Sequence, residues 1–177
     1  EAAARRQSAR LRALNISPME DKERMHPFDA SLELEAVGEG NATGYRARTS
    51  DRYRNAIGPF GGWTAALLLQ SVLQTAAARG TPLALDAVFM GPIDDGELET
   101  RVFVLRQNRT VGFWRSELWQ RDRMCAHAQI ALSAARTGAV LRDATFPAVP
   151  RAQDVAIYTN PRTPVAWIEQ YEFRPVS

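Results

Sequence analysis

The stretch that decides the fold is Asn55-Ala56-Ile57-Gly58-Pro59-Phe60-Gly61-Gly62-Trp63, and the residues after it, 64–78, carry no charged side chain. Gly61 and Gly62 allow a ligand to approach the backbone closely. The first N–H groups of a following helix are unpaired and lie at the positive end of its dipole, so a carbonyl oxygen or an oxyanion is stabilised there. The pattern therefore predicts either such a binding site or, more simply, a glycine turn before a core helix.

Residues 64–78 are predicted to form a helix that is buried on most sides. Gln70, Ser71, Gln74 and Thr75 recur at helical spacing among alanine, leucine and valine residues. A membrane span needs about 18 or more residues with few charges. The polar residues argue against a span and favour a core helix with one thin polar seam, which needs a sheet to cover it.

Six further segments show the composition and alternation typical of strands. They are residues 31–37, 42–48, 82–90, 97–106, 111–120 and 124–134. The first two flank Gly38-Glu39-Gly40-Asn41 and are predicted to form a hairpin, and the last four an antiparallel meander. This order resembles the hot-dog fold, an α+β fold in which a curved antiparallel sheet wraps around one long central helix.

Three motifs sharpen the resemblance. They are Arg52-Tyr53-Arg54-Asn55 with Gly58-Pro59-Phe60-Gly61-Gly62, then Phe89-Met90-Gly91-Pro92, then Val104-Leu105-Arg106-Gln107-Asn108-Arg109-Thr110. Over residues 26–135 the chain resembles the acyl-CoA thioesterase II-type (TesB-like) family. The resemblance implies hydrolysis of acyl-CoA thioesters to free acid and coenzyme A, by water activated near the start of the helix. It implies no cofactor apart from the coenzyme A of the substrate.

Members of that family usually carry two hot-dog units in tandem. We therefore expect an N-terminal helical extension over residues 1–25, a hot-dog domain over 26–137, a linker with a short helix over 138–170, and the start of a second unit over 171–177. Thr163-Pro164 has the pattern of an N-cap and first helical position for the linker helix. The expected partner is a second hot-dog unit, in the same chain or in a homodimer.

The resemblance also assigns residues to the binding of the substrate acyl-CoA. These residues are Gly61, Gly62, Trp63, Asn108 and Arg109. Backbone N–H groups at the first three would polarise the thioester carbonyl, and loss of one such donor costs on the order of a hundredfold or more in rate. Arg109 could meet a phosphate or the adenine of coenzyme A, with Arg106 as its competitor.

Water activation is assigned by the resemblance to Asp86, Thr110 and Gln129. Asp86 is an isolated carboxylate in an apolar segment, where burial would tune its pKa; the alternative is that it lies at a strand edge in water. The alternative for Thr110 is a structural role in a turn with Asn108. The register of Gln129 is open, because Ile130 could occupy its place.

Two other functions remain open at this level. One is a hot-dog module that binds acyl-CoA or supports a partner half without turnover. The other is a hydratase or dehydratase, which needs a histidine facing a carboxylate, and His127 beside Asp86 could supply that pair. Fold alone does not choose among these functions.

Composition sets the outer limits. The chain has 177 residues, 45% of them apolar, and a formal net charge of +2, which suffices for one domain-sized core and does not favour nucleic acid as a partner. With one cysteine, Cys125, and no apolar signal segment at the start, we expect a cytoplasmic location. His26, His127 and Cys125 lack the spacing of metal ligands, so no metal site is expected.

Overall fold

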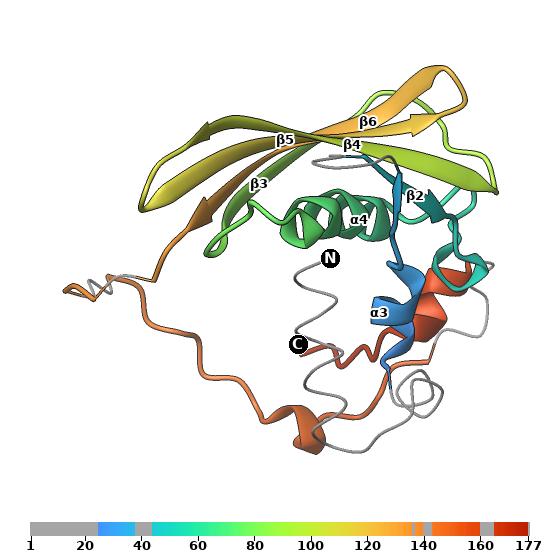
Figure 1. The fold of residues 1–177 in the computed structure, drawn as a ribbon. Helices are drawn as coiled ribbons and strands as arrows, with labels where there is room; N and C mark the ends of the chain where they lie inside the picture. The colour runs from blue at the N-terminus through green and yellow to red at the C-terminus, as the bar shows by residue number, and fades with distance from the viewer. Residues whose placement is uncertain (1–24, 38–43, 136, 140–142, 160–164, 177) are drawn as a thin grey trace, which may run out of the picture.

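The computed structural model describes residues 25–37, 44–135, 137–139, 143–159 and 165–176. In these residues one antiparallel sheet lies across the main helix, and the chain that leaves the sheet passes below that helix (Figure 1). The expected α+β arrangement, a curved antiparallel sheet around one long helix, is confirmed. The predicted N-terminal helical extension up to residue 24, the turn at residues 38–41 and the pair Thr163-Pro164 lie outside the described residues.

The described elements, in chain order, are α3 (Pro27–Ser31), β1 (Glu35–Val37), β2 (Gly44–Arg48), the 3-10 helix η1 (Asp51–Tyr53), α4 (Gly61–Gln74), β3 (Thr81–Phe89), β4 (Glu97–Gln107), β5 (Val111–Gln120), β6 (Arg123–Ser133), and the 3-10 helices η2 (Ala152–Asp154) and η3 (Ala166–Gln170). The strands lie in the order β1-β2-β4-β5-β6-β3. The predicted four-strand meander is therefore wrong at its first strand, because β3 pairs with β6 and β2 takes the place beside β4; the meander holds for β4, β5 and β6. Each neighbouring pair is antiparallel.

The first predicted strand is shorter than the sequence pattern indicates. Of the predicted residues 31–37, Ser31 is the last residue of α3, residues 32–34 connect the two elements, and only Glu35–Val37 is a strand. Pro27 lies in the first turn of α3, where its fixed φ favours a helix, and the His26 ring accepts a hydrogen bond from the Phe28 N–H at 3.2 Å. The strand was therefore predicted too long at its start, because the strand pattern does not show where this short helix ends.

The boundaries of α4 also differ from the predicted 64–78. The helix begins at Gly61 and ends at Gln74. Both Gly61 and Gly62 lie in the first turn, where glycine costs less than in a helix interior. Thr75 ends the helix because its backbone is extended, with φ −66° and ψ 130°.

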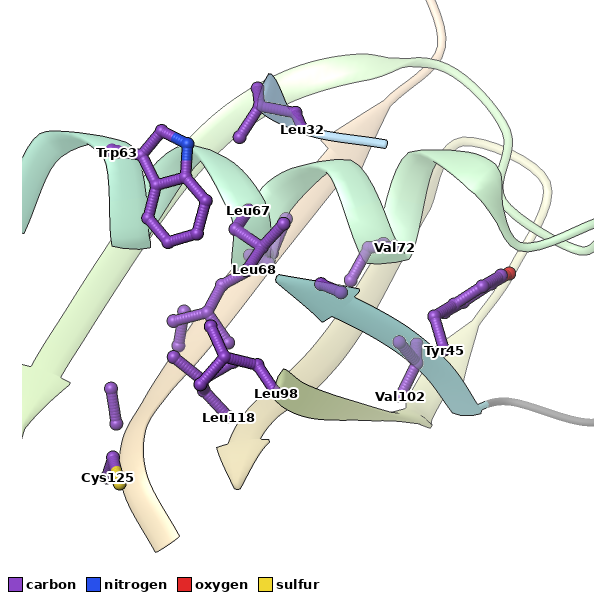
Figure 2. Packing of buried hydrophobic residues seen from close by; sticks show 14 of the residues in the cluster. Leu32, Tyr45, Trp63, Leu67, Leu68, Val72, Leu98, Val102, Leu118 and Cys125 are labelled. Atoms are coloured by element: carbon purple, nitrogen blue, oxygen red, sulfur yellow. The ribbon is translucent and has the colours of Figure 1, made fainter. Parts of the chain in front are cut away.

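The core lies between α4 and the sheet. Trp63, Leu67, Leu68 and Val72 of α4 are all 0% exposed. They pack against the helix-facing residues of the central strands, including Leu118, and Figure 2 shows this packing. Residues of β5 and β6 alternate between this face and the opposite, outer face of the sheet, as the two-residue period of a strand requires.

The predicted polar seam of α4 finds partners inside the core. The Ser71 hydroxyl lies 2.7 Å from the Ser116 hydroxyl of β5, and the Thr75 hydroxyl lies 3.2 Å from the hydroxyl of Tyr45. Gln74 donates to the Leu34 carbonyl at 3.1 Å. These bonds compensate the burial of polar groups, which would otherwise cost about 1–3 kcal/mol each.

One edge of the sheet is long, apolar and exposed. Among the described strands, β3 is bonded only to β6, and the other edge is the short β1. Leu83 is 68% exposed, Val88 43% and Phe89 54%. An edge of this kind is a template for pairing with another strand.

The packing of α4 is tested by replacing two of its leucine residues, one buried and one exposed, with alanine in separate variants. Leu68→Ala removes a side chain that is 0% exposed, whereas Leu73 on the same helix is 39% exposed. We expect Leu68→Ala to lower the free energy of unfolding by about 2–5 kcal/mol, and Leu73→Ala by less than about 1 kcal/mol. Urea denaturation followed by circular dichroism measures both, and equal losses would contradict the described packing.

Candidate functional site

The start of α4 presents backbone N–H groups without a cap. No side chain caps the helix among the described residues, and the first N–H that donates within the first turn is that of Thr64, to the Phe60 carbonyl at 3.1 Å. The N–H groups of Gly61, Gly62 and Trp63 precede this bond, so they have no acceptor in the helix. They lie at the positive end of the helix dipole and suit a carbonyl oxygen that gains negative charge.

A tight loop delivers the chain to this helix start. Gly58 has φ +66°, and a methyl group at this position would lie 2.3 Å from the Ile93 carbonyl oxygen, so only glycine fits. The Asn55 N–H donates to the Gly58 carbonyl at 2.8 Å and closes the loop. At the base of the loop, Arg54 forms an ion pair with Asp95.

The Trp63 side chain fixes the helix start from within the core. Its indole N–H donates to the Ser31 hydroxyl at 2.9 Å, and Ser31 donates to the Phe28 carbonyl at 2.6 Å. This chain of bonds ties the first turn of α4 to α3. Trp63 can therefore contribute only its backbone N–H to a ligand, because its ring is fully buried.

The two glycines of the helix start have different surroundings. A methyl group on Gly61 would lie 3.5 Å from the ring of Phe89, at ordinary contact distance. On Gly62 it would lie 2.5 Å from the ring of Phe60, which forces that ring to move. Phe89 is 54% exposed and belongs to the edge strand β3. The uncapped N–H groups thus lie next to an exposed aromatic surface.

The structure brings Asp86 and Gln129 together. They are opposite each other across β3 and β6, and Gln129 is also opposite Arg115 of β5. All three belong to the outer face of the sheet, because the neighbouring Ile130 faces α4 and is 2% exposed. Asp86 itself is exposed. The sequence left two possibilities for Asp86, a buried carboxylate and a carboxylate at a strand edge in water. In this chain Asp86 lies at a strand edge in water, because β3 is an edge strand.

Thr110 lies away from this pair, in the turn between β4 and β5. The Asn108 side-chain oxygen accepts hydrogen bonds from the N–H groups of Thr110, at 2.9 Å, and Val111, at 2.8 Å. The structural role expected as the alternative for these two residues is therefore present. Val111 is opposite Ser133, which at roughly 3.3 Å per residue is about 13 Å along β6 from Gln129.

A pocket of about 240 Å³ adjoins this turn. Arg79 and Arg109 line it together with Asn108 and Thr110, while Arg106 does not. Gln107 donates to the Ala77 carbonyl at 3.0 Å, so the pocket lies beyond the C-terminal end of α4. Two guanidinium groups in one pocket suit a phosphate. The sequence suggested only Arg109 or Arg106 as the contact with coenzyme A. It did not indicate Arg79, because Arg79 lies in none of the motifs.

A second cluster of polar side chains lies around His127 on the outer face of the sheet. His127 is opposite Val88 on one side and Glu117 on the other, so it is a diagonal neighbour of Asp86. Glu117 pairs with Arg115 at 2.8 Å. The Nδ1 atom of His127 is buried and has no hydrogen-bond partner in the described part of the chain. A His127–Asp86 hydrogen bond, which a hydratase would use, is not formed there.

The expected site residues therefore fall into three places. Gly61, Gly62 and Trp63 lie at the start of α4, Asp86 and Gln129 on the outer face of the sheet, and Asn108, Arg109 and Thr110 near the other end of α4. Strand alternation separates the first place from the second, because the outer face of the sheet points away from the helix. The described residues hold no cluster of metal-binding side chains, and none of their helices has the length and apolar character of a membrane span.

Comparisons with known proteins show what this chain is similar to. Residues 49–133 match the model of the acyl-CoA thioesterase N-terminal domain family, and no curated protein matches the chain. Among solved structures, a conserved protein of unknown function with a hot-dog fold from Alicyclobacillus acidocaldarius is 26% identical, with a TM-score of 0.80 over 86% of this chain and 56% of that chain. A candidate thioesterase II from Thermobifida fusca YX is 25% identical, with a TM-score of 0.67 over 77% of this chain and 50% of that one.

A third solved structure, the acyl-CoA thioesterase II TesB2 from Mycobacterium marinum, is 24% identical, with a TM-score of 0.60 over 73% of this chain and 47% of that one, and shows the fold alone. The chain spans about half the length of these three structures. The antiparallel sheet across α4 agrees with this likeness, so the fold is the hot-dog fold. Through the match of residues 49–133 and the shared fold, this chain is similar to the acyl-CoA thioesterase N-terminal domain family.

Proposed function

We propose that this chain is the first hot-dog unit of a thioesterase that hydrolyses acyl-CoA thioesters to a free acid and coenzyme A. The observation that carries the proposal is the uncapped start of α4, next to exposed Phe89 and within the residues that match the family. A thioester carbonyl oxygen there accepts hydrogen bonds from the N–H groups of Gly61 and Gly62. Water adds to the carbonyl carbon, the oxygen gains negative charge that these groups stabilise, and the carbon–sulfur bond then breaks.

Asp86 and Gln129 are proposed to hold and activate the water, although the outer face on which they lie points away from the carbonyl-binding N–H groups of this unit. A carboxylate can take the proton of the attacking water, and the leaving thiolate takes up a proton afterwards. Their position on the outer face favours a second candidate function, a unit that binds acyl-CoA without turnover. In that case the second unit supplies the water-activating groups, and Asp86 is only an exposed residue of the edge strand β3 with no part in the reaction.

Arg109 and Arg79 are proposed to hold a phosphate of the coenzyme A portion, since both line the pocket near the end of α4. Coenzyme A is part of the substrate, and the proposal includes no further cofactor. Bidentate hydrogen bonds from guanidinium groups suit phosphate oxygens. Thr110 is proposed to act there through its contact with Asn108 rather than on the water. The cytoplasmic location and the division into domains remain predictions.

A second hot-dog unit is proposed to cover the edge strand β3. The exposed apolar residues on β3 and the greater length of the solved relatives support this proposal. The unit belongs either to the same polypeptide or to a second copy of this chain. Pairing along β3 would satisfy the free N–H and carbonyl groups of the edge.

The helix start is tested by Gly61→Ala. The new methyl group makes an ordinary contact with Phe89, and alanine favours a helix, so the fold is expected to stay intact. The methyl group displaces the thioester by about 1 Å, and we expect kcat/KM for acyl-CoA to fall by about a hundredfold. Release of the coenzyme A thiol, followed with a thiol reagent, measures the rate. Gly138→Ala, where a methyl group meets open space, is the control.

Unchanged kcat/KM in the Gly61→Ala protein would move the carbonyl-binding site away from α4 of this unit. Gly62 is less suitable for this test, because a side chain there collides with the Phe60 ring before it meets a substrate.

Asp86→Asn separates the enzyme from the binding module. The substitution keeps the size of the side chain and removes the base, so a catalytic Asp86 predicts a loss in kcat of roughly a hundredfold or more with little change in acyl-CoA affinity. Asp122→Asn, in the turn between β5 and β6, is the matched control. Parent-level turnover in Asp86→Asn would exclude Asp86 as the base, and acyl-CoA binding without turnover in the parent protein would favour the module.

The proposed pairing along β3 is tested by the oligomeric state in solution of this 177-residue chain expressed alone. We expect light scattering to report a dimer, and Val88→Lys on β3 to dissociate it because it places a charge in the paired edge. Val37→Lys on β1 is the matched control, since Val37 is 37% and Val88 43% exposed. A stable monomer for the parent chain would contradict pairing between copies.

A further inference from the structure

We infer that Trp167, beyond the hot-dog domain, is a positioning residue that holds the Phe60 ring clear of the N–H groups at the start of α4. Phe60 immediately precedes the helix, whereas Trp167 belongs to η3, far along the chain. Figure 1 shows this last segment returning to the region of α3 and the loop before α4. The predicted effect on acyl-CoA rests on the proposed function, whereas the effect on Phe60 does not.

The backbone of Phe60 is fixed by hydrogen bonds, but its ring is not fixed by them. Its N–H donates to the Tyr53 carbonyl at 2.7 Å, and its carbonyl accepts from the Thr64 N–H at 3.1 Å. The ring lies over Gly62, where an added methyl group would meet a ring carbon at 2.5 Å. A small rotation of the ring would therefore change the space in front of the free N–H groups.

Trp167 stacks on this ring. The planes of the two rings are 9° apart and their centroids 4.2 Å apart. Tyr171 adds an edge contact to Phe60 with centroids 6.1 Å apart, and another to Trp167 at 5.8 Å. Phe60 is thus held between the backbone of Gly62 and an aromatic group that comes from the segment after the domain.

Trp167 is itself attached to the loop that leads into the helix. Its backbone N–H donates to the Arg54 carbonyl at 3.3 Å, and Arg54 pairs with Asp95 on the other side of the loop. Burial raises the pKa of the Tyr53 hydroxyl, and the neighbouring Tyr171 is the second cause of this rise. Both agree with close packing of this segment on η1. The segment therefore holds the loop at its beginning through Arg54 and at its end through Phe60.

Removal of the Trp167 ring would leave Phe60 without its stacking partner. Without the stack the end of the loop opens more often, and the Phe60 ring becomes free to rotate from its place over Gly62 into the space beside Gly61. A ring that occupies that space competes with the substrate, so only a fraction of the molecules can bind. The apparent KM rises by the inverse of that fraction, while kcat of the bound complex is unchanged.

The experiment compares Trp167→Ala, Trp167→Phe and the control Trp119→Ala in the whole protein. Trp119 lies on β5 and contacts Arg101 and Glu117 instead of the loop. We expect Trp167→Ala to raise KM for acyl-CoA by about five- to tenfold with kcat within twofold, as loss of one aromatic stack implies. Trp167→Phe, which retains a stack, should restore the parent KM. A fall in kcat with constant KM, or an equal KM rise in Trp119→Ala, would overturn the inference.

A second measurement is independent of turnover. Hydrogen exchange should be faster at the Phe60 amide in Trp167→Ala, and unchanged at the amides of β5 and β6. Unchanged exchange at Phe60 would overturn the inference even in an active protein, whereas faster exchange in a protein that hydrolyses no acyl-CoA would refute only the proposed function. If Trp167→Ala does not fold, Trp167→Leu, which also removes the aromatic stack but keeps an apolar side chain, takes its place; a parent-level KM in that variant would also overturn the inference.

Discussion

Burial of α4 against one face of the sheet is the constraint on which the rest of the structure depends. Trp63, Leu67, Leu68 and Val72 lose all contact with solvent on that face. At about 25 cal/mol per Å² of apolar surface, each side chain of this size contributes roughly 1.5–3 kcal/mol. The sheet must curve around the helix to reach them, and every residue on a strand is thereby assigned either to the core or to the outer face.

The same constraint makes the start of α4 available for chemistry. The indole of Trp63 anchors the first turn inside the core, while Gly61 and Gly62 leave the outer side of that turn without side chains. A helix end that lacks a cap costs stability, because its N–H groups have no partner in the protein. Here those groups lie beside two aromatic rings, Phe89 and Phe60, while Gly62 itself is exposed. Electrostatic stabilisation of a developing oxyanion is stronger where water is excluded from such a site than in open water.

The outer face has a different character. Asp86, Gln129 and Arg115 form one row across three strands, and Glu117 and His127 form the adjacent pair. The outer face therefore carries polar residues that suit contact with water, whereas the edge strand β3 exposes apolar side chains that do not. A second unit on that edge would cover Val88 and Phe89, and it would change the surroundings of Asp86 as well, because Asp86 belongs to the same strand.

The sequence alone determined the kind of fold and the elements that build it, and tertiary structure decided which candidate residues meet. Alternation in residues 97–134 and the uncharged run 64–78 were sufficient for antiparallel strands and a core helix, because these patterns reflect local periodicity. The curved sheet around that helix came from the resemblance of their order to the hot-dog fold. The first strand was predicted too long at its start, because Ser31 still belongs to the short helix that begins at Pro27 and the strand pattern does not show where that helix ends. Whether Asp86 is buried depends on β3 being the last strand of the sheet, which pairing across the whole chain fixes. Trp167 carried no sequence signal, because its stack on Phe60 joins residues too far apart along the chain to share a local pattern.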